Sequence, residues 1–178
     1  PFVTFGDEFQ QAAVRLDNDA ILEQSILTSS NVVLPMFFVP GPTLGEETDA
    51  VSPVLSSNTL TGVQPAGGKW SVQEGRAPTL PLDKFAAAAL AVGHVNIQAE
   101  SDGVMRRESP ALKYRDAYYP SFALQCARAF TGMSLKDLAI VPGARLTVGK
   151  MTVPLDRRSG ILLSYLGPAQ TFPYFSVF

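Results

Sequence analysis

Polar and apolar residues alternate strictly between residues 94 and 99, where the sequence reads HVNIQA. Successive side chains of a strand point to opposite faces, so this pattern predicts a strand with one apolar face. Asp102 and Gly103 follow, and this pair favours a tight turn because glycine adopts positive φ without strain. Val104–Glu108 then reads as a returning strand. The pattern predicts a β-hairpin over residues 94–108.

Apolar residues recur at helical spacing in three other stretches and predict helices over residues 17–31, 81–93 and 120–132. Aspartate suits an N-cap, proline the first helical turn and glycine the C-terminal cap, and these residues stand at the ends of the three stretches. Ser134 and Asp137 resemble a capping pair for one further short turn.

Three more strands follow from apolar runs. Val32–Val39 is apolar but interrupted by Pro35, which lacks an N–H and so predicts an edge strand or a bend. Alternating residues on both sides of Gly149 and Lys150 predict a second hairpin. Ile161–Leu166 is apolar on both faces, as expected of a central strand.

Residues 40–79 combine many Pro, Gly, Ser and Thr residues with few periodic apolar positions, and predict a long irregular insertion. The remaining pattern predicts a mixed α/β (α+β) fold, in which a mixed sheet with antiparallel hairpins is packed against helices. At 178 residues, one domain over residues 1–178 is expected.

Composition narrows the function classes. The chain is 46% hydrophobic and 17% charged, which is typical of a globular domain, and its formal net charge of −2 gives no basic field for nucleic acid. No apolar run approaches the roughly 18 residues that a membrane helix needs. A single cysteine, Cys126, excludes an internal disulfide.

Catalytic and cofactor motifs are missing from the sequence. There is one histidine, His94, which we expect to be an exposed strand residue, and no Gly-x-Ser-x-Gly motif accompanies it. Ser121 stands where a helix cap is expected. No Walker loop, Rossmann glycine pattern or metal-ligand spacing occurs, so neither a cofactor nor a metal is predicted.

Arg106 and Arg107 are the most informative charged residues. Consecutive strand residues face opposite sides, so one of the two is expected to point inward or toward a cleft. A guanidinium in such a place needs an anionic partner, and Glu100, Asp102 or a bound anion are the candidates. A structural salt bridge and a ligand site both remain open.

Three motifs in this region, GHVN (93–96), DGVMRR (102–107) and YPSFAL (119–124), resemble the core of CHASE2 domains. Segments 31–35, 153–156 and 160–168 resemble further parts of the family pattern. These are extracytoplasmic sensor domains of bacterial transmembrane receptors. The usual opening strand and helix and the closing strand of the family lack counterparts here, which suggests a segment truncated at both ends.

The resemblance implies an extracytoplasmic (periplasmic or extracellular) sensory domain, itself not an enzyme. An external cue would change the packing between two protomers, and a cytoplasmic adenylate cyclase, histidine kinase or similar output domain would receive it. Contact with the membrane would be made only by flanking helices. An unknown small-molecule or anionic ligand is expected at five residues: Asn96, Asp102, Arg106, Arg107 and Tyr119.

Two alternatives remain at this point. One is a periplasmic hydrolase, which would need two titratable groups converging in a pocket. The other is a dimerisation or interaction domain without a small ligand. Its contacts would involve the alanine-rich helix and the aromatic tail over residues 172–178, which must be packed or bound to a partner.

Overall fold

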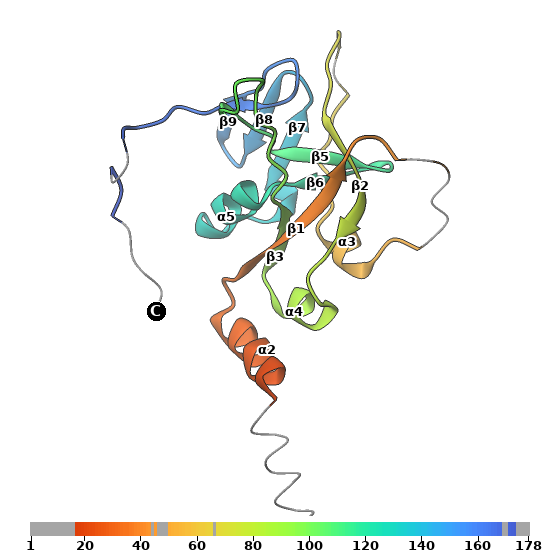
Figure 1. Cartoon of the computed structure of the whole chain (residues 1–178), viewed down its shortest axis with the longest axis vertical. Coiled ribbons are helices and arrows are strands. Elements are labelled where there is room, and N and C mark those ends of the chain that lie inside the picture. The colour runs from red at the N-terminus through yellow and green to blue at the C-terminus, as the bar shows by residue number, and fades with distance from the viewer. Residues whose placement is uncertain (1–16, 44, 46–49, 66, 169–170, 174–178) are drawn as a thin grey trace, which may run out of the picture.

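The structure is a computed structural model that describes residues 17–43, 45, 50–65, 67–168 and 171–173 (Figure 1). Its content is mixed α/β, as predicted, with helices packed on a mixed sheet. Five strands make the main sheet, in the order β3 (Ala91–His94), β1 (Val33–Pro40), β2 (Gln73–Thr79), β5 (Ala111–Tyr114) and β6 (Ala117–Pro120). The β1–β3 and β2–β5 pairs are parallel, whereas β1–β2 and β5–β6 are antiparallel.

Pro35 was expected to mark an edge strand or a bend. It lies inside β1, which has a neighbour on each side, so the edge position was wrong, and the strand is irregular only further on, between Phe37 and Val39. Pairing with β3 covers Val33–Met36, and pairing with β2 begins only at Phe37. The Val95 N–H donates to the Met36 carbonyl at 2.9 Å, so Met36 turns its backbone toward β3. Neighbouring strand residues face opposite sides, and Pro35 therefore faces the side where β2 does not yet pair. Its missing N–H costs no ladder hydrogen bond.

The predicted hairpin over residues 94–108 is limited to its turn. Gly103 N–H donates to the Glu100 carbonyl at 2.9 Å, Glu100 N–H donates to the Val104 carbonyl at 3.1 Å, and Gly103 has φ of 80°. These bonds close a three-residue loop with a glycine bulge. Strand pairing stops because the Asn96 side chain, and not the backbone, takes the next position beside β1. Its Oδ1 accepts from Phe38 N–H at 2.9 Å and its Nδ2 donates to the Phe38 carbonyl at 2.6 Å.

Two smaller sheets complete the strands. One holds β7 (Leu138–Val141), β8 (Arg145–Val148) and β9 (Met151–Pro154), and its β8–β9 pair confirms the hairpin predicted around Gly149 and Lys150. The other pairs β4 (Arg107–Glu108) with β10 (Ile161–Leu162).

The central strand predicted over Ile161–Leu166 was wrong. Its regular part is two residues long and pairs only with β4, and Leu163 N–H adds one bond to the Arg106 carbonyl at 2.8 Å. Leu162 is 68% exposed and Leu166 74% exposed, because no second sheet partner covers this side.

The helices keep their predicted starts better than their ends. Ser134 and Asp137 form the predicted capping box, and Asp17 accepts from Ala20 N–H as the N-cap of its helix. The helix expected over 81–93 is shorter, because the chain turns to extended backbone at Ala89. In the described residues the helices are α2 (Asn18–Ser29), α3 (Pro53–Ser57), α4 (Asp83–Ala88), α5 (Phe122–Phe130) and the 3-10 turn η1 (Leu135–Asp137).

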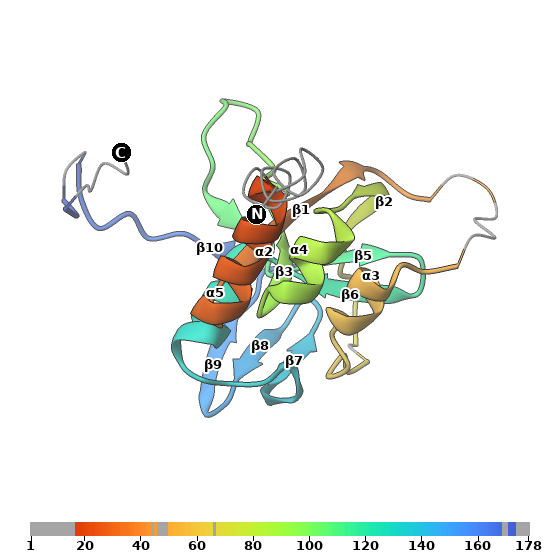
Figure 2. The same cartoon turned by 90° about the horizontal axis from the view of Figure 1, so that it is seen from below.

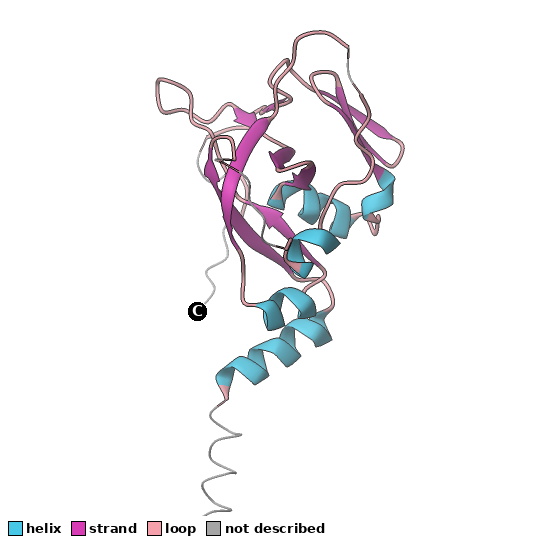
Figure 3. Cartoon of the chain, turned by 90° about the vertical axis from the view of Figure 1, so that its right-hand side faces the viewer, coloured by secondary structure: helices cyan, strands magenta, loops and turns pink. Residues whose placement is uncertain are grey.

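Figure 2 shows α2 and α4 side by side, and Lys84 Nζ bonds Asp19 Oδ2 at 2.9 Å between them. Figure 3 shows these helices below one end of the strands, so the opposite end of the main sheet stays free of them. The cleft described below lies near that other end.

The segment 40–79 is not irregular throughout, which corrects the predicted insertion. It supplies β2 of the main sheet and the short helix α3, whose Val54 and Leu55 are buried with Leu60. Its backbone also bridges the second sheet at Val63 and Ile140. Short elements in a Pro- and Gly-rich stretch leave no long periodic pattern, and this explains why the sequence reading missed them.

The buried apolar residues form two clusters. The first lies on the main sheet and the second joins α5 to the β7–β8–β9 sheet. The first cluster contains Met36, Phe38, Val54, Leu55, Val92, Leu112, Tyr114 and Tyr119. The second contains Leu60, Ala111, Leu124, Leu138, Ile140, Leu146, Val148 and Leu155.

The aromatic tail expected to be packed is only partly described. Phe172 is 62% exposed, while Tyr174, Phe175 and Phe178 lie outside the described residues. Across the described residues, none of the helices has the length and apolar character that crossing a bilayer requires.

Candidate functional site

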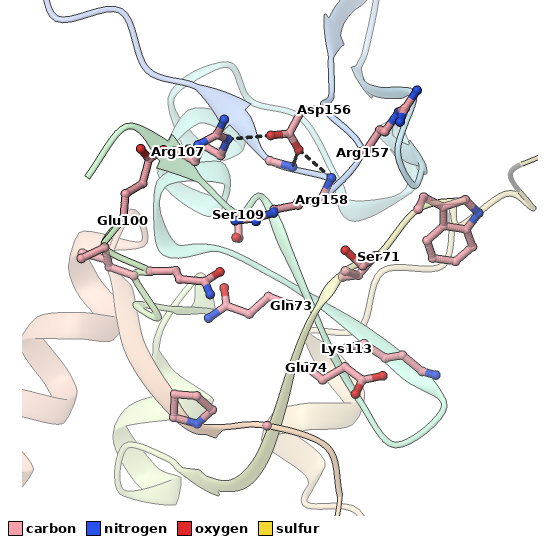
Figure 4. A pocket seen from close by; sticks show the side chains of 18 of the residues that line it. Ser71, Gln73, Glu74, Glu100, Arg107, Ser109, Lys113, Asp156, Arg157 and Arg158 are labelled. Carbon is pink, nitrogen blue, oxygen red and sulfur yellow. Dashed lines mark hydrogen bonds and ion pairs between the residues drawn. The ribbon is translucent and has the colours of Figure 1, made fainter. Parts of the chain in front are cut away.

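A cleft of about 1370 Å³ lies beside β2 and β5 (Figure 4). The end of β1, with Pro40, Gly41 and Pro42, contributes to its lining. The other walls come from four separate parts of the chain: the start of β2 with the residues before it, the loop after β3, β4 with the β5–β6 hairpin, and the turn after β9. Charged and polar side chains from all four meet in it. The main lining residues are Trp70, Ser71, Gln73, Glu74, Gln98, Glu100, Arg107, Ser109, Lys113, Asp156, Arg157 and Arg158.

Arg107, at the start of β4, is the predicted site residue that reaches the cleft. Its Nε donates to Asp156 Oδ2 at 2.7 Å, and its Nη1 bonds Glu100 Oε1. The guanidinium therefore joins the loop after β3 to the turn after β9. One of the two arginines does point toward a cleft, as predicted.

Arg106 lies outside the cleft lining and binds two carboxylates of the preceding turn. Its Nη1 is 3.1 Å from Glu100 Oε2 and 2.8 Å from Asp102 Oδ2. A bond from Val104 N–H, and then the one from Arg106, lower the pKa of Asp102. The sequence named Glu100 and Asp102 as candidate partners, and both arginines use Glu100, one through each carboxylate oxygen.

Asp156 is the partner that the sequence reading missed. Its Oδ1 accepts from the N–H groups of Arg158 at 2.8 Å and Gly160 at 2.9 Å, so one carboxylate holds the turn and the arginine together. Burial opposes ionisation, but the bonds from Gly160, Arg107 and Arg158 outweigh it and hold the pKa of Asp156 below its ordinary value. An Asp followed by Arg-Arg-Ser-Gly is a local signal for such a turn, but not for its distant arginine.

The other two predicted site residues are buried in the fold. Asn96 is 6% exposed and bonds the Phe38 backbone, as described above. Tyr119 is 2% exposed and its ring lies 5.5 Å from that of Phe38, centroid to centroid. Neither lines the cleft, so the structure brings Arg106, Arg107 and Asp102 together but not Asn96 or Tyr119.

His94 is buried, which corrects the exposed position expected for it. It is 1% exposed, and both ring nitrogens are without a hydrogen-bond partner within the described residues. Burial lowers the pKa of His94 to about 4. It is paired in the sheet with Met36 and bridges Ser121, whose hydroxyl accepts from Leu124 N–H as the predicted helix cap.

Metal-ligating groups do not gather in the described part of the chain, where no cluster of three or more His, Cys, Asp or Glu side chains occurs. In the cleft, Glu100 and Asp156 are both bound to Arg107. The arrangement offers hydrogen-bonding and charged groups for recognition of a polar molecule.

These features define a small mixed α/β domain with a polar cleft beside its main sheet. The model of the CHASE2 domain family matches residues 3–178, and the chain therefore belongs to this family. CHASE2 domains are extracytoplasmic sensory domains of signalling receptors and are not catalytic. No curated protein and no solved structure matches the chain.

Proposed function

We propose that this CHASE2 domain is the ligand-recognition part of a bacterial membrane-bound receptor, and that it passes an external cue to a cytoplasmic cyclase, kinase or similar output domain. The family supports the sensory role. The cleft supports the recognition step, because a ligand there would touch four segments that are far apart in the sequence. A ligand shifts a conformational equilibrium only when it binds the two states differently, and a cleft between segments can provide that difference.

The observation that carries this proposal is the position of Arg107, which lines the cleft and also contacts the last described part of the chain. Arg107 binds Asp156 in the turn after β9, and β4 itself pairs with β10, the last strand described. A ligand that changes the contacts of Arg107 would therefore act on the segment that follows residue 160. Of the predicted residues, we assign contact with the ligand to Arg107, and support of its loop to Arg106 and Asp102.

A thermal-shift screen of small anions and metabolites tests the recognition step. Each hit is repeated with Arg107→Ala and Arg106→Ala, and we expect Arg107→Ala to reduce the shift more, because Arg107 lines the cleft. Asp116→Ala is the matched control, since Asp116 is exposed and lies outside the cleft lining. A hit that keeps its full shift in both arginine variants would remove this cleft from the proposal.

A second candidate function, contact between two protomers without a small ligand, is favoured by one observation. The helix α2 exposes Ile21 at 54%, Leu22 at 48% and Leu27 at 49%, and buries only Ile26. Exposed apolar side chains grouped on one element are typical of an interaction surface. Sedimentation of the domain and of Leu22→Glu tests it: a homodimer lost in the variant supports the contact, and a monomer at all concentrations contradicts it.

A further inference from the structure

The cleft contains more basic groups than its own carboxylates neutralise. Its basic lining residues are Arg107, Lys113, Arg157 and Arg158, and its acidic ones are Glu74, Glu100 and Asp156. Glu100 and Asp156 are both bound to Arg107. One carboxylate, Glu74, is left for the other basic residues, although the whole chain carries a formal net charge of −2.

Arg158 is the basic residue of the cleft best placed to bind an anion. No ion pair with a carboxylate is formed by its guanidinium within the described residues. In Figure 4 its side chain runs from the turn after β9 toward Ser109 and the interior of the cleft, whereas Arg157 extends outward.

The backbone that carries Arg158 is held from three sides. Asp156 Oδ1 accepts from Arg158 N–H at 2.8 Å, and Arg107 holds the other oxygen of the same carboxylate. Ser159, which is 2% exposed, donates from its hydroxyl to the Ser71 carbonyl at 2.7 Å and accepts from Gly143 N–H at 2.9 Å. The backbone of this turn is therefore ordered before a ligand binds, and only the exposed side chain of Arg158 has to be ordered on binding.

A second group in the same cleft also lacks a partner. The side-chain oxygen of Gln73 is buried and accepts no hydrogen bond within the described residues. A buried acceptor without a donor is costly, and this favours a ligand that also donates a hydrogen bond at this wall.

Resting on the function proposed above, we infer that the cleft binds an acidic small molecule, and that Arg158 is the residue that binds its carboxylate or phosphate group. Arg106 and Arg107 are not the anion-binding groups, because Glu100, Asp102 and Asp156 already occupy them. Arg107 also lines the cleft, and through its bond to Asp156 it positions the turn that carries Arg158. Guanidinium binds planar carboxylates and phosphates with two parallel hydrogen bonds, which suits a ligand of this class.

Lys113 and Glu74 set the charge at the far wall of the cleft. They are paired in the register between β2 and β5, and Figure 4 shows their side chains next to each other, away from Arg158. Glu74 repels an acidic ligand and Lys113 attracts it. Removing the carboxylate of Glu74 should therefore strengthen binding.

The test is a titration of the domain with inorganic phosphate and, separately, with succinate, followed by NMR at the arginine Nε–H signals. The Arg158 signal is assigned from its loss in Arg158→Gln, and thermal unfolding checks that each variant is folded. We expect saturable shifts at Arg158, binding at least about tenfold weaker in Arg158→Gln, and little change in the neighbouring control Arg157→Gln. Glu74→Gln should bind more tightly.

Unchanged affinity in Arg158→Gln would overturn the assignment, as would an equal loss in Arg157→Gln, which would indicate only a diffuse charge effect. Binding that is lost in Arg107→Ala but retained in Arg158→Gln would overturn this inference and leave the sensory proposal intact. Failure of both probes to bind the unmodified domain would also overturn it. The metabolite screen described above would then decide the sensory proposal separately.

Discussion

Arg107 and Asp156 stand 49 positions apart in the chain, yet Nε of the arginine donates to Oδ2 of the aspartate at 2.7 Å. The same arginine binds Glu100, and the same aspartate accepts two backbone N–H groups from the turn that follows it. The two ion pairs of Arg107 thus connect β4, the loop after β3 and the turn after β9. All three meet at the cleft.

Asp156→Ala should cost more stability than Arg107→Ala. The Asp156→Ala variant loses the ion pair with Arg107 and both hydrogen bonds from the turn, and its free energy of unfolding should decrease by about 1–3 kcal/mol in total. The Arg107→Ala variant loses only ion pairs that are partly exposed to solvent. In the pair with Asp156, the Arg107 side chain is 38% exposed and the Asp156 side chain 34% exposed, so the expected cost is about 1 kcal/mol or less. Urea unfolding at neutral pH measures both. Asp116→Ala, an exposed aspartate in the turn between β5 and β6, should change stability little, and equal costs for the two main variants would contradict this account.

Gly93→Ala should be strongly destabilising, although Gly93 lies in an ordinary strand. A Cβ at this position would stand 2.7 Å from both the backbone nitrogen and the Cα of Phe122 at the start of α5. Backbone atoms cannot move aside as a flexible side chain can, so the helix would have to shift, at about 1–3 kcal/mol or more. The midpoint and slope of urea unfolding measure this cost.

The matched control for that variant is Gly67→Ala, because an added Cβ at Gly67 meets nothing within 4 Å. Its effect should stay within about 0.5 kcal/mol. If Gly93→Ala and Gly67→Ala unfold at the same urea concentration, α5 does not approach β3 as closely as described.

Local chemistry was predictable from the sequence. The caps at Asp17 and Ser121, the capping box at Ser134, and the hairpin at Gly149 each depend on residues within about four positions of one another. In such cases the side chain that satisfies a backbone group lies beside it in the sequence, and the pattern is sufficient. The three motifs over residues 93–124 pointed to the family, and the match of the CHASE2 family model confirms that membership.

Long-range partners were not predictable from one sequence. Asn96 binds the backbone of Phe38, 58 positions away, and Asp156 binds Arg107 across a similar gap. The alternating pattern over residues 94–99 is real, but Asn96 ends the strand pairing with a side chain instead of continuing it. The apolar run from Ile161 likewise carries no information on how many strands will flank it, and only β4 does.

Asn96→Ala tests whether this predicted site residue acts on the ligand or on the fold. Removing the amide leaves Phe38 N–H and its carbonyl without their partners, and a cost of about 1–3 kcal/mol is expected. Gln98→Ala is the control two residues along, because Gln98 is exposed and lines the cleft. Its stability should be near that of the unmodified domain. Loss of ligand response with unchanged stability in Asn96→Ala would support the original assignment of Asn96 to the ligand site.

The stability of the domain should decrease as the pH is lowered from 6.5 to 4, and His94 is the cause. Burial lowers the pKa of His94 from 6.5 to about 4. In this window the unfolded chain binds a proton at the imidazole and the folded chain does not. Unfolding is therefore favoured as pH falls, by up to about 1.4 kcal/mol per pH unit and about 3 kcal/mol in total. Glu108 acts in the opposite direction, since burial raises its pKa, and the stability it contributes at low pH is lost as pH rises.

Comparison with His94→Leu isolates the histidine, because the contribution of Glu108 is present in both proteins. We expect the free energy of unfolding of the variant to be nearly independent of this titration, so the difference between the two proteins should grow as pH falls from 6.5 to 4. Urea unfolding at several pH values no lower than 4 measures it. Asp102, Asp137 and Asp156, whose pKa values are lowered from 3.8, begin to lose their contributions near the bottom of this range, but they are present in both proteins and cancel from the difference. Parallel pH profiles for the two proteins would mean that His94 is not buried in its neutral form.

The leucine variant is also expected to be the more stable of the two at pH 4, because it removes two buried nitrogens that have no partner within the described residues.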